Sequence, residues 1–420
     1  MLAIVIVGSG SLPAQDIPSP CVEPDCVLLD VPYHCQEHEG WCWAACGEMI
    51  MDFFQVFVRQ CDQVNQRTTQ DCCPAFPEED LACNFPDWPH FKSYGFRVTK
   101  SRRPLAWVHL QNQLAVARRP FAWAYAARGS RVVGHMLVVC GYFSLQGVPM
   151  VVYQNPNPWC GDPERDPNAY PLSAYAYDQY ANGPIAGYYH RLDIFPVPKT
   201  TPEDAAPHPV ALGAPNPDST AAPQPDWGRT PEAAVANILT AFAALGTNTN
   251  PVRYGFLTPA EITLARPGIP ASIQVLPFAD LLTAKRGATL ESLLQPTGQF
   301  IIPVAVNRQT RCAVTLQRQG PNWQVAGLGD AAVARTLVAT RARSSARSVL
   351  SPRAYFIVRL PFGLNTFVLA HRANPGLILT PLYDDAPVGF RAGVDISAAV
   401  ALPALIRQAQ RTPGFPEEEP

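Results

Sequence analysis

The sequence predicts an α+β protein in two parts, with a cysteine-bearing helix packed on an antiparallel β-sheet in the first part. Apolar residues recur at three- and four-residue spacings over residues 42–59, which indicates a largely buried helix. Apolar runs of strand length, separated by turn residues, indicate an antiparallel sheet from residues 120–126, 132–142 and 149–153. Nine prolines between residues 196 and 225 make a stretch that cannot bury a core, so it predicts a linker.

Length and composition fit two domains. The chain has 420 residues, and its 47% hydrophobic content is ample for buried cores. A net charge of -2 gives no reason to expect nucleic acid or an anionic membrane as a partner. No apolar run is long enough to cross a membrane, so no membrane span is expected.

The cysteines and the first residues bear on where the protein works. Eleven of the twelve cysteines lie between Cys21 and Cys160, and setting one aside as a nucleophile leaves ten that could pair. This density favours an oxidising compartment and hence secretion, whereas a cytosolic protein with free or metal-bound thiols is the alternative. Residues 1–26 form an N-terminal segment, in which the apolar residues 2–7 belong either to a cleaved signal or leader or to an initial strand.

The first turn of the helix from residue 42 is suited to a nucleophile. Cys42 lies there, where unpaired N–H groups and the positive end of the helix dipole favour an anion. A thiolate is such an anion, so the pKa of Cys42 is expected to be lowered. Gln36 lies six residues upstream on a loop, and its side-chain amide together with the Cys42 N–H would form an oxyanion hole.

Gln36 followed by Cys42-Trp43-Ala44-Ala45 resembles the papain-like cysteine peptidases, and more closely their bacterial branch that includes the AvrRpt2-type secreted peptidases. The resemblance covers residues 27–195 and implies a papain-like fold, with Cys42 as nucleophile and Gln36 in the oxyanion hole. The family also needs a histidine and an Asn or Asp further along the chain.

The residues 134–142 match the histidine strand of that family. His135 follows Gly134 and opens an apolar strand that ends in Gly141-Tyr142, as in the family. One ring nitrogen must face Cys42 while the Nδ1–H is held by an orienting group. The segment Asn157-Pro158-Trp159 resembles the family's Asp-Pro-Trp or Asn-Ser-Trp, so Asn157 is the preferred orienter and Asn155 the alternative.

Two further features follow from the resemblance. Trp43 and Trp159 would shape and shield the site, although both could equally be core residues. A comparable run of cysteines follows the Cys-Trp-Ala-Ala helix in the bacterial branch, and a long polar segment seldom orders without covalent links. We therefore expect two disulfides, with the connectivity open, among Cys61, Cys72, Cys73 and Cys83.

The second part, residues 229–412, follows a linker at 196–228 and is predicted to be a small α+β domain. Helices are expected at 230–244, 278–294, 331–343 and 398–409, and strands at 300–305, 312–317, 323–326, 355–360, 366–371 and 377–380. This part shows no catalytic constellation. A substrate- or partner-binding module and an inhibitory segment are both open, and a linker of this kind predicts that the two parts fold independently.

Taken together, the residues predict a cysteine peptidase that acts on a peptide or protein substrate without a cofactor or metal. Two other functions stay open. A zinc-binding module is one of them, but it would leave Gln36 and His135 without a role. Its ligands would be His34, Cys35, His38, Cys42 and Cys46. A catalytically inactive papain-like fold could serve as a binding protein.

Overall fold

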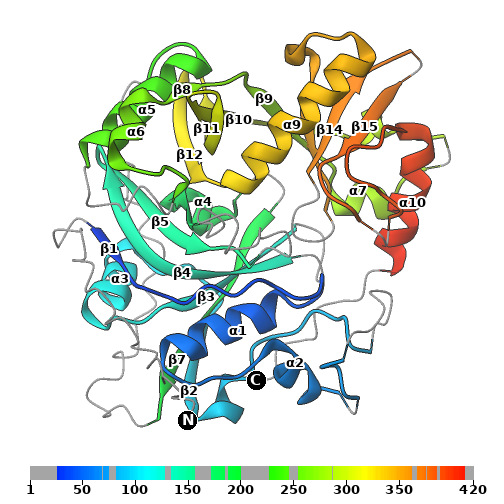
Figure 1. The fold of residues 1–420 in the computed structure, drawn as a ribbon. Coiled ribbons are helices and arrows are strands. Elements are labelled where there is room, and N and C mark those ends of the chain that lie inside the picture. The colour runs from blue at the N-terminus through cyan, green and yellow to red at the C-terminus, as the bar shows by residue number, and fades with distance from the viewer. Residues whose placement is uncertain are drawn as a thin grey trace, which may run out of the picture.

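The sheet of this protein runs through both halves of the chain. The computed structural model describes residues 26–68, 70–74, 82–127, 134–156, 172–184, 188–199, 227–245, 254–285, 287–361, 367–374, 376–385 and 388–411. Across these residues the strands hydrogen-bond in the order β16-β15-β14-β13-β9-β10-β11-β12-β6-β5-β4-β3-β7-β2, with β1 on β4 and β8 on β10 (Figure 1). Only β9 and β13 pair in parallel among the described strands, so the sheet is mixed. The α+β prediction is confirmed at this level.

The strands predicted for the first part are present and antiparallel. The strands of this half are β1 (Cys26–Leu28), β2 (Phe96–Ser101), β3 (Phe121–Ala127), β4 (Gly134–Leu145), β5 (Val148–Gln154), β6 (Leu172–Ala176) and β7 (Tyr188–Pro198). Almost every residue of β3 and β4 is buried, because helices cover one face and other strands pack beside them. β7 runs to Pro198, so the first residues assigned to the linker continue a strand.

Helices of the first half lie against this sheet. They are α1 (Cys42–Phe53), α2 (Gln60–Asn65), η1 (Phe91–Tyr94), α3 (Trp107–Gln111), η2 (Asn112–Val116) and α4 (Tyr177–Asn182). The buried side of α1 packs against β4 and β3 (Figure 1). The helix is shorter than predicted because Gln55 adopts a left-handed conformation (φ 61°). The N–H of Val56 then returns to the carbonyl of Met51 at 2.9 Å, which closes the helix end.

The second half adds the remaining strands and helices. The strands are β8 (Arg266–Pro267), β9 (Ala271–Val275), β10 (Gln295–Val306), β11 (Gln309–Gln319), β12 (Asn322–Gly329), β13 (Phe356–Arg359), β14 (Phe367–Arg372), β15 (Leu377–Pro381) and β16 (Ile396–Ser397). The helices are α5 (Pro231–Ala244), α6 (Pro259–Leu264), α7 (Phe278–Leu282), α8 (Leu290–Leu293), α9 (Ala331–Ser348), η6 (Pro352–Ala354) and α10 (Ala398–Arg411). The single helix predicted for residues 278–294 is wrong. α7 ends at Leu282, and Thr289 caps a separate helix with a capping box to Ser292.

The two halves meet along β6 and β12. Gly327 pairs with Tyr175 and Leu328 with Ala174 in antiparallel register. Next to this seam, the Ser173 hydroxyl donates to Asp330 Oδ1 at 3.0 Å. A second contact lies behind the sheet, where the ring of Phe143 meets Phe242 and Tyr254 at centroid distances of 6.1 and 6.2 Å. Residues of both halves therefore share one core.

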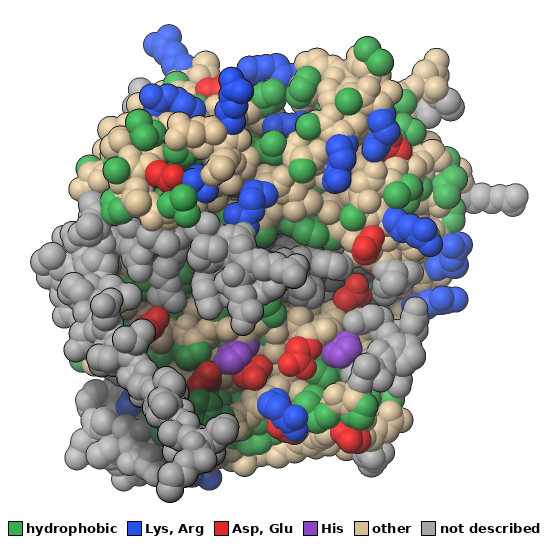
Figure 2. Space-filling model, in the orientation of Figure 1, with side chains coloured by type: hydrophobic (Ala, Val, Ile, Leu, Met, Phe, Trp, Pro, Cys, Tyr) green, Lys and Arg blue, Asp and Glu red, His purple; other side chains and the backbone are tan. Residues whose placement is uncertain are grey.

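Both signs of charge occur over both halves of the molecule. On the face drawn in Figure 2, most Lys and Arg side chains lie over the C-terminal half with some Asp and Glu among them, and the His side chains lie beside Asp and Glu over the N-terminal half. On the loop before α1, His34 Nε2 lies 2.8 Å from Asp52 Oδ2 of that helix. None of the helices in the described ranges is long and apolar enough to cross a membrane.

Candidate active site

The start of α1 brings the Cys42 sulfur to the start of β4. Cys42 is the first residue of α1, is a free cysteine and is 4% exposed. The backbone N–H of Met136 lies close enough to this sulfur to stabilise its thiolate. Met136 follows His135, which is the second residue of β4 and is 2% exposed. The predicted base is therefore the residue next in sequence to the one whose N–H acts on the sulfur of the predicted nucleophile.

His135 is held by Asn155 through its Nε2 atom. The distance from His135 Nε2 to Asn155 Oδ1 is 2.7 Å, so the Nε2–H donates to the amide oxygen. Asn155 follows β5 and is itself fixed, because the Tyr33 hydroxyl donates to its carbonyl oxygen at 2.7 Å. The preceding Gln154 donates to the carbonyl of Val31 at 2.8 Å. The end of β5 is thus tied to the loop that leads to Cys42.

This arrangement reverses the nitrogens expected from the sequence. The prediction has Nδ1–H held by the orienting group, whereas in the structure Nε2 is held and Nδ1 has no hydrogen-bond partner among the described residues. Nδ1 of His135 is then the unprotonated nitrogen that can accept a proton. Asn155, the alternative orienter, occupies the orienting position. Asn157 and Trp159 lie outside the described residues.

Burial decides the protonation of the pair. It raises the pKa of the Cys42 thiol to about 11, although the N–H groups of Met136, Trp43 and Cys42 itself lower it. Burial also lowers the pKa of the His135 imidazole to about 3. The lowered pKa expected for Cys42 is therefore wrong for this structure, because desolvation outweighs the helix-start N–H groups. At neutral pH the resting pair is a thiol and a neutral imidazole.

Gln36 braces the loop before the nucleophile. Its side chain is 2% exposed, and Nε2 donates to the carbonyls of His38 and Glu39, both at 2.6 Å. The carbonyl of His38 also accepts the N–H of Trp41 at 3.0 Å, which closes the turn. The Gln36 Oε1 atom is buried without a hydrogen-bond partner among the described residues. The amide therefore holds the turn in this structure, and its oxyanion role stays a prediction.

Three hydrogen bonds fasten the residues around Cys42 to the segment at residues 83–85. The indole of Trp41 donates to the carbonyl of Cys83 at 2.7 Å, and the indole of Trp43 donates to the carbonyl of Phe85 at 3.0 Å. Between them, the N–H of Gly40 donates to Asn84 Oδ1 at 2.7 Å. A Cβ on Gly40 would lie 2.7 Å from that same oxygen, so the loop can approach only with glycine.

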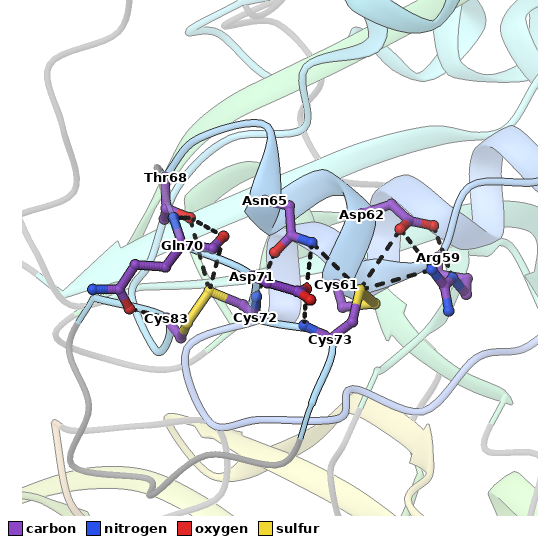
Figure 3. The surroundings of a disulfide bond; sticks show 10 residues. All are labelled: Arg59, Cys61, Asp62, Asn65, Thr68, Gln70, Asp71, Cys72, Cys73 and Cys83. Carbon is purple, nitrogen blue, oxygen red and sulfur yellow. Dashed lines mark hydrogen bonds and ion pairs between the residues drawn. A yellow bond between two sulfur atoms is a disulfide. The ribbon is translucent and has the colours of Figure 1, made fainter.

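Disulfides fix this supporting segment. Cys61 pairs with Cys73 and Cys72 with Cys83, at Cα–Cα distances of 4.9 and 5.6 Å (Figure 3). The prediction of two disulfides among these four residues is confirmed. The Cys72–Cys83 bond fixes Cys83, and the carbonyl of Cys83 accepts the hydrogen bond from the Trp41 indole. One hydrogen bond therefore joins this disulfide to the residue before Cys42.

The other cysteines separate into bonded and free ones. Cys26 and Cys35 are disulfide-bonded, and a bonded Cys35 cannot serve as a zinc ligand. Not all of the ten cysteines that could pair do so, since Cys46 and Cys140 are buried and belong to no disulfide. Both behave as small apolar residues of the core.

Removing the Cys72–Cys83 bond tests its support of the site. The double variant Cys72→Ser, Cys83→Ser is expected to lose about 3 kcal/mol of stability, since the bond closes a loop with a sequence separation of 11. For the peptide hydrolysis that the sequence predicts, it is also expected to lower kcat/KM by about 10²-fold per folded molecule, the effect of a misplacement of about 1 Å at a reacting centre. Thermal unfolding and steady-state rates measure the two effects.

The other disulfide supplies a matched control. Cys61→Ser, Cys73→Ser opens a loop with a separation of 12, so the expected stability loss is similar. The sulfur of Cys73 contacts Arg59, Asp62 and Asn65 (Figure 3), and this bond reaches the loop before α1 only through Gln60, whose side chain stays in place in the variant and bonds to Cys35 and Glu37. Its kcat/KM should therefore stay within about threefold of the wild type. Equal losses of kcat/KM in the two double variants would refute the claim that the Cys72–Cys83 bond specifically supports the candidate site.

Several of these supporting residues carry no local sequence signal. Tyr33 and Asn84 act over 122 and 44 residues of sequence, and a single sequence does not show contacts of that range. The buried Trp41 next to Cys42 was the one visible clue, because a buried indole needs an acceptor for its N–H. No protein-family model matches the sequence, and no curated protein matches it.

Proposed function

We propose that this protein is a papain-like cysteine peptidase. The observation that carries the proposal is the position of Cys42 at the start of α1, beside the start of β4, where Asn155 holds His135 and leaves Nδ1 available. A nucleophile next to a base that a third group orients is the arrangement used for acyl transfer. The sequence Cys42-Trp43-Ala44-Ala45 after Gln36 supports the same activity by resemblance.

The reaction would proceed from the neutral pair. His135 Nδ1 takes the proton of the Cys42 thiol as the sulfur attacks the carbonyl carbon of the scissile peptide. The negative oxygen of the tetrahedral intermediate accepts a hydrogen bond from the Cys42 N–H, and from the Gln36 amide once that amide leaves the carbonyls of its turn. The imidazolium gives its proton to the leaving amine, and the acyl group stays on sulfur as a thioester. Water, deprotonated by His135, then releases the acid and restores the thiol.

The compartment and the substrate belong to the same proposal. Disulfides at Cys61–Cys73 and Cys72–Cys83 persist in an oxidising environment, so we place the enzyme outside the cytosol. Its substrates would be peptides or proteins presented in extended form, because an acyl transfer site needs the carbonyl within reach of the sulfur.

Covalent trapping tests the proposal. A peptide that carries an epoxide should alkylate Cys42, because the sulfur opens the ring and forms a thioether, and peptide mapping by mass spectrometry locates the adduct. The His135→Ala variant should form the adduct at least about 10²-fold more slowly, the contribution of a positioned base. Cys46→Ala is the matched control, since Cys46 is a buried free thiol one turn along the same helix, and it should react like the wild type. An adduct on another cysteine, or an unchanged rate in His135→Ala, would refute the proposal.

A further inference from the structure

A side chain from the C-terminal half reaches the residues behind His135. Arg359 is the last residue of β13, and its Nη2 donates to the hydroxyl of Tyr125 on β3 at 3.2 Å, over 234 residues of sequence. Its guanidinium also lies over the ring of Tyr188 on β7 at 4.9 Å and over the ring of Phe367 on β14 at 5.4 Å. The guanidinium is therefore held by side chains from both halves of the chain.

Tyr125 contacts both Arg359 and the imidazole of His135. Tyr125 and His135 are opposite each other in the register of β3 and β4, and their rings meet edge to face with centroids 5.9 Å apart and planes at 89°. The other side of the Tyr125 ring meets Tyr188 at 5.6 Å. Tyr125 is 5% exposed, so its hydroxyl needs a partner inside the protein, and Arg359 is that partner.

The charge of Arg359 lies among aromatic side chains. Arg359 is half-buried, and tyrosine rings surround its guanidinium. No carboxylate of the described residues forms an ion pair with it, although its charge acts to lower the pKa of the buried Asp330 carboxyl, which burial raises. A cation at this place acts on the titratable groups beside it, which a methionine or leucine would not do.

We propose that Arg359 is a positioning residue of the candidate active site, which fixes Tyr125, and through it the His135 ring, from the C-terminal half of the sheet. This inference rests on the proposed peptidase function and adds that the site is complete only with both halves of the chain. The C-terminal half then takes part in catalysis without supplying a reacting group.

The charge of Arg359 gives the proposal a signature that packing alone lacks. The group that meets the His135 ring directly is Tyr125 from β3, and the neutral Asn155 holds its Nε2. The titratable groups that interact with Arg359 from β13 are Tyr125, Tyr175 from β6, Tyr188 from β7 and the carboxyl of Asp330. Of these, Arg359 carries the fixed positive charge, which opposes protonation of the imidazole and lowers the pKa of His135, after burial. Without that charge, the His135 imidazolium becomes harder to deprotonate, so the acid limb, which is the low-pH edge of the profile of Cys42 reactivity against pH, should move to higher pH.

The experiment compares Arg359→Met, Arg359→Lys and Tyr125→Phe in the full-length protein. The rate at which iodoacetamide alkylates Cys42 is followed against pH, with thermal unfolding to show that each variant is folded. Arg359→Met should move the acid limb upward by about one pH unit, the effect of one nearby charge in partly buried surroundings. Arg359→Lys keeps the positive charge, so its acid limb should lie at the wild-type pH. Tyr125→Phe keeps the ring and the charge of Arg359 but removes the hydroxyl that Arg359 binds, so its acid limb should also lie at the wild-type pH.

Peptide hydrolysis supplies the second readout. Arg359→Met and Tyr125→Phe should each lower kcat by about tenfold with little change in KM, a fraction of the ~10²–10⁴ that a positioned base contributes. A folded Arg359→Met protein with the wild-type pH profile and kcat would overturn the inference while leaving the peptidase proposal intact. If the wild type hydrolyses no peptide, the peptidase proposal fails, and the alkylation profile alone decides whether Arg359 acts on the Cys42–His135 pair.

Discussion

Replacing Cys42 with alanine is expected to lower kcat/KM for a peptide substrate by about 10⁴-fold or more. The sulfur forms the covalent bond in the proposed mechanism, and removing the nucleophile of such a unit leaves only the catalysis provided by binding and the oxyanion donors. The side chain is 4% exposed and small, so alanine leaves a cavity of little more than one atom and the fold should persist. Hydrolysis rates measure the loss of activity, and thermal unfolding of the same preparations shows whether the fold persists.

The comparison variant for this experiment is Cys140→Ala. Cys140 is a buried cysteine on β4 that belongs to no disulfide, and its Sγ lies 3.8 Å from the Val152 carbonyl oxygen. It loses the same atom from an equally buried place, so it should unfold like Cys42→Ala but keep the wild-type hydrolysis rate. Activity retained in Cys42→Ala, or lost equally in both variants, would exclude Cys42 as the nucleophile.

A chain that ends after residue 199 is expected to be insoluble or unfolded. The proline-rich stretch alone predicts the opposite, since such a linker usually separates domains that fold independently. In the structure, however, β6 loses its pairing with β12 on truncation, and Phe143 loses both Phe242 and Tyr254. Exposed strand edges and apolar surface of this kind cause aggregation, and the lost contacts are worth several kcal/mol of a total of about 5–15 kcal/mol.

Circular dichroism and size-exclusion chromatography of the fragment test this expectation. The control is the full chain cut through a protease site inserted between residues 200 and 226, in which both halves are present but no longer covalently joined. The cut protein should elute as one particle and retain the proposed peptidase activity, because β6 and β12 still pair. A soluble fragment with a cooperative thermal transition would show that the first half is an independent domain.

The sequence predicts those parts of the site that depend on local pattern. Cys42 at a helix start and His135 at a strand start follow from apolar spacing, and both are where that spacing places them. The protonation of the pair could not be predicted, because it depends on burial by residues distant in sequence rather than on the helix start.

Long-range pairing is the other part that the sequence does not show. The sequence before β6 shows no strand pattern. The sequence of β12 predicts a strand, but it does not specify β6 as the strand with which β12 pairs. The sequence favours Asn157 as the orienter and leaves Asn155, two residues before it, as the alternative. Only the register at the end of β5, tied down by Tyr33, brings Asn155 to the ring.

The pairing of β6 with β12 also sets an order of events during synthesis. Tyr175 leaves the ribosome about 150 residues before its partner Gly327, which at about 5–20 residues per second is a wait of roughly 8–30 s. Throughout that interval the strand edge beside the nascent site has no permanent neighbour, and chaperones are the cell's usual protection for such an edge. Arg359 emerges later still. Cys42, the proposed nucleophile, is thus made early but acquires its complete surroundings only when synthesis of the chain is nearly finished.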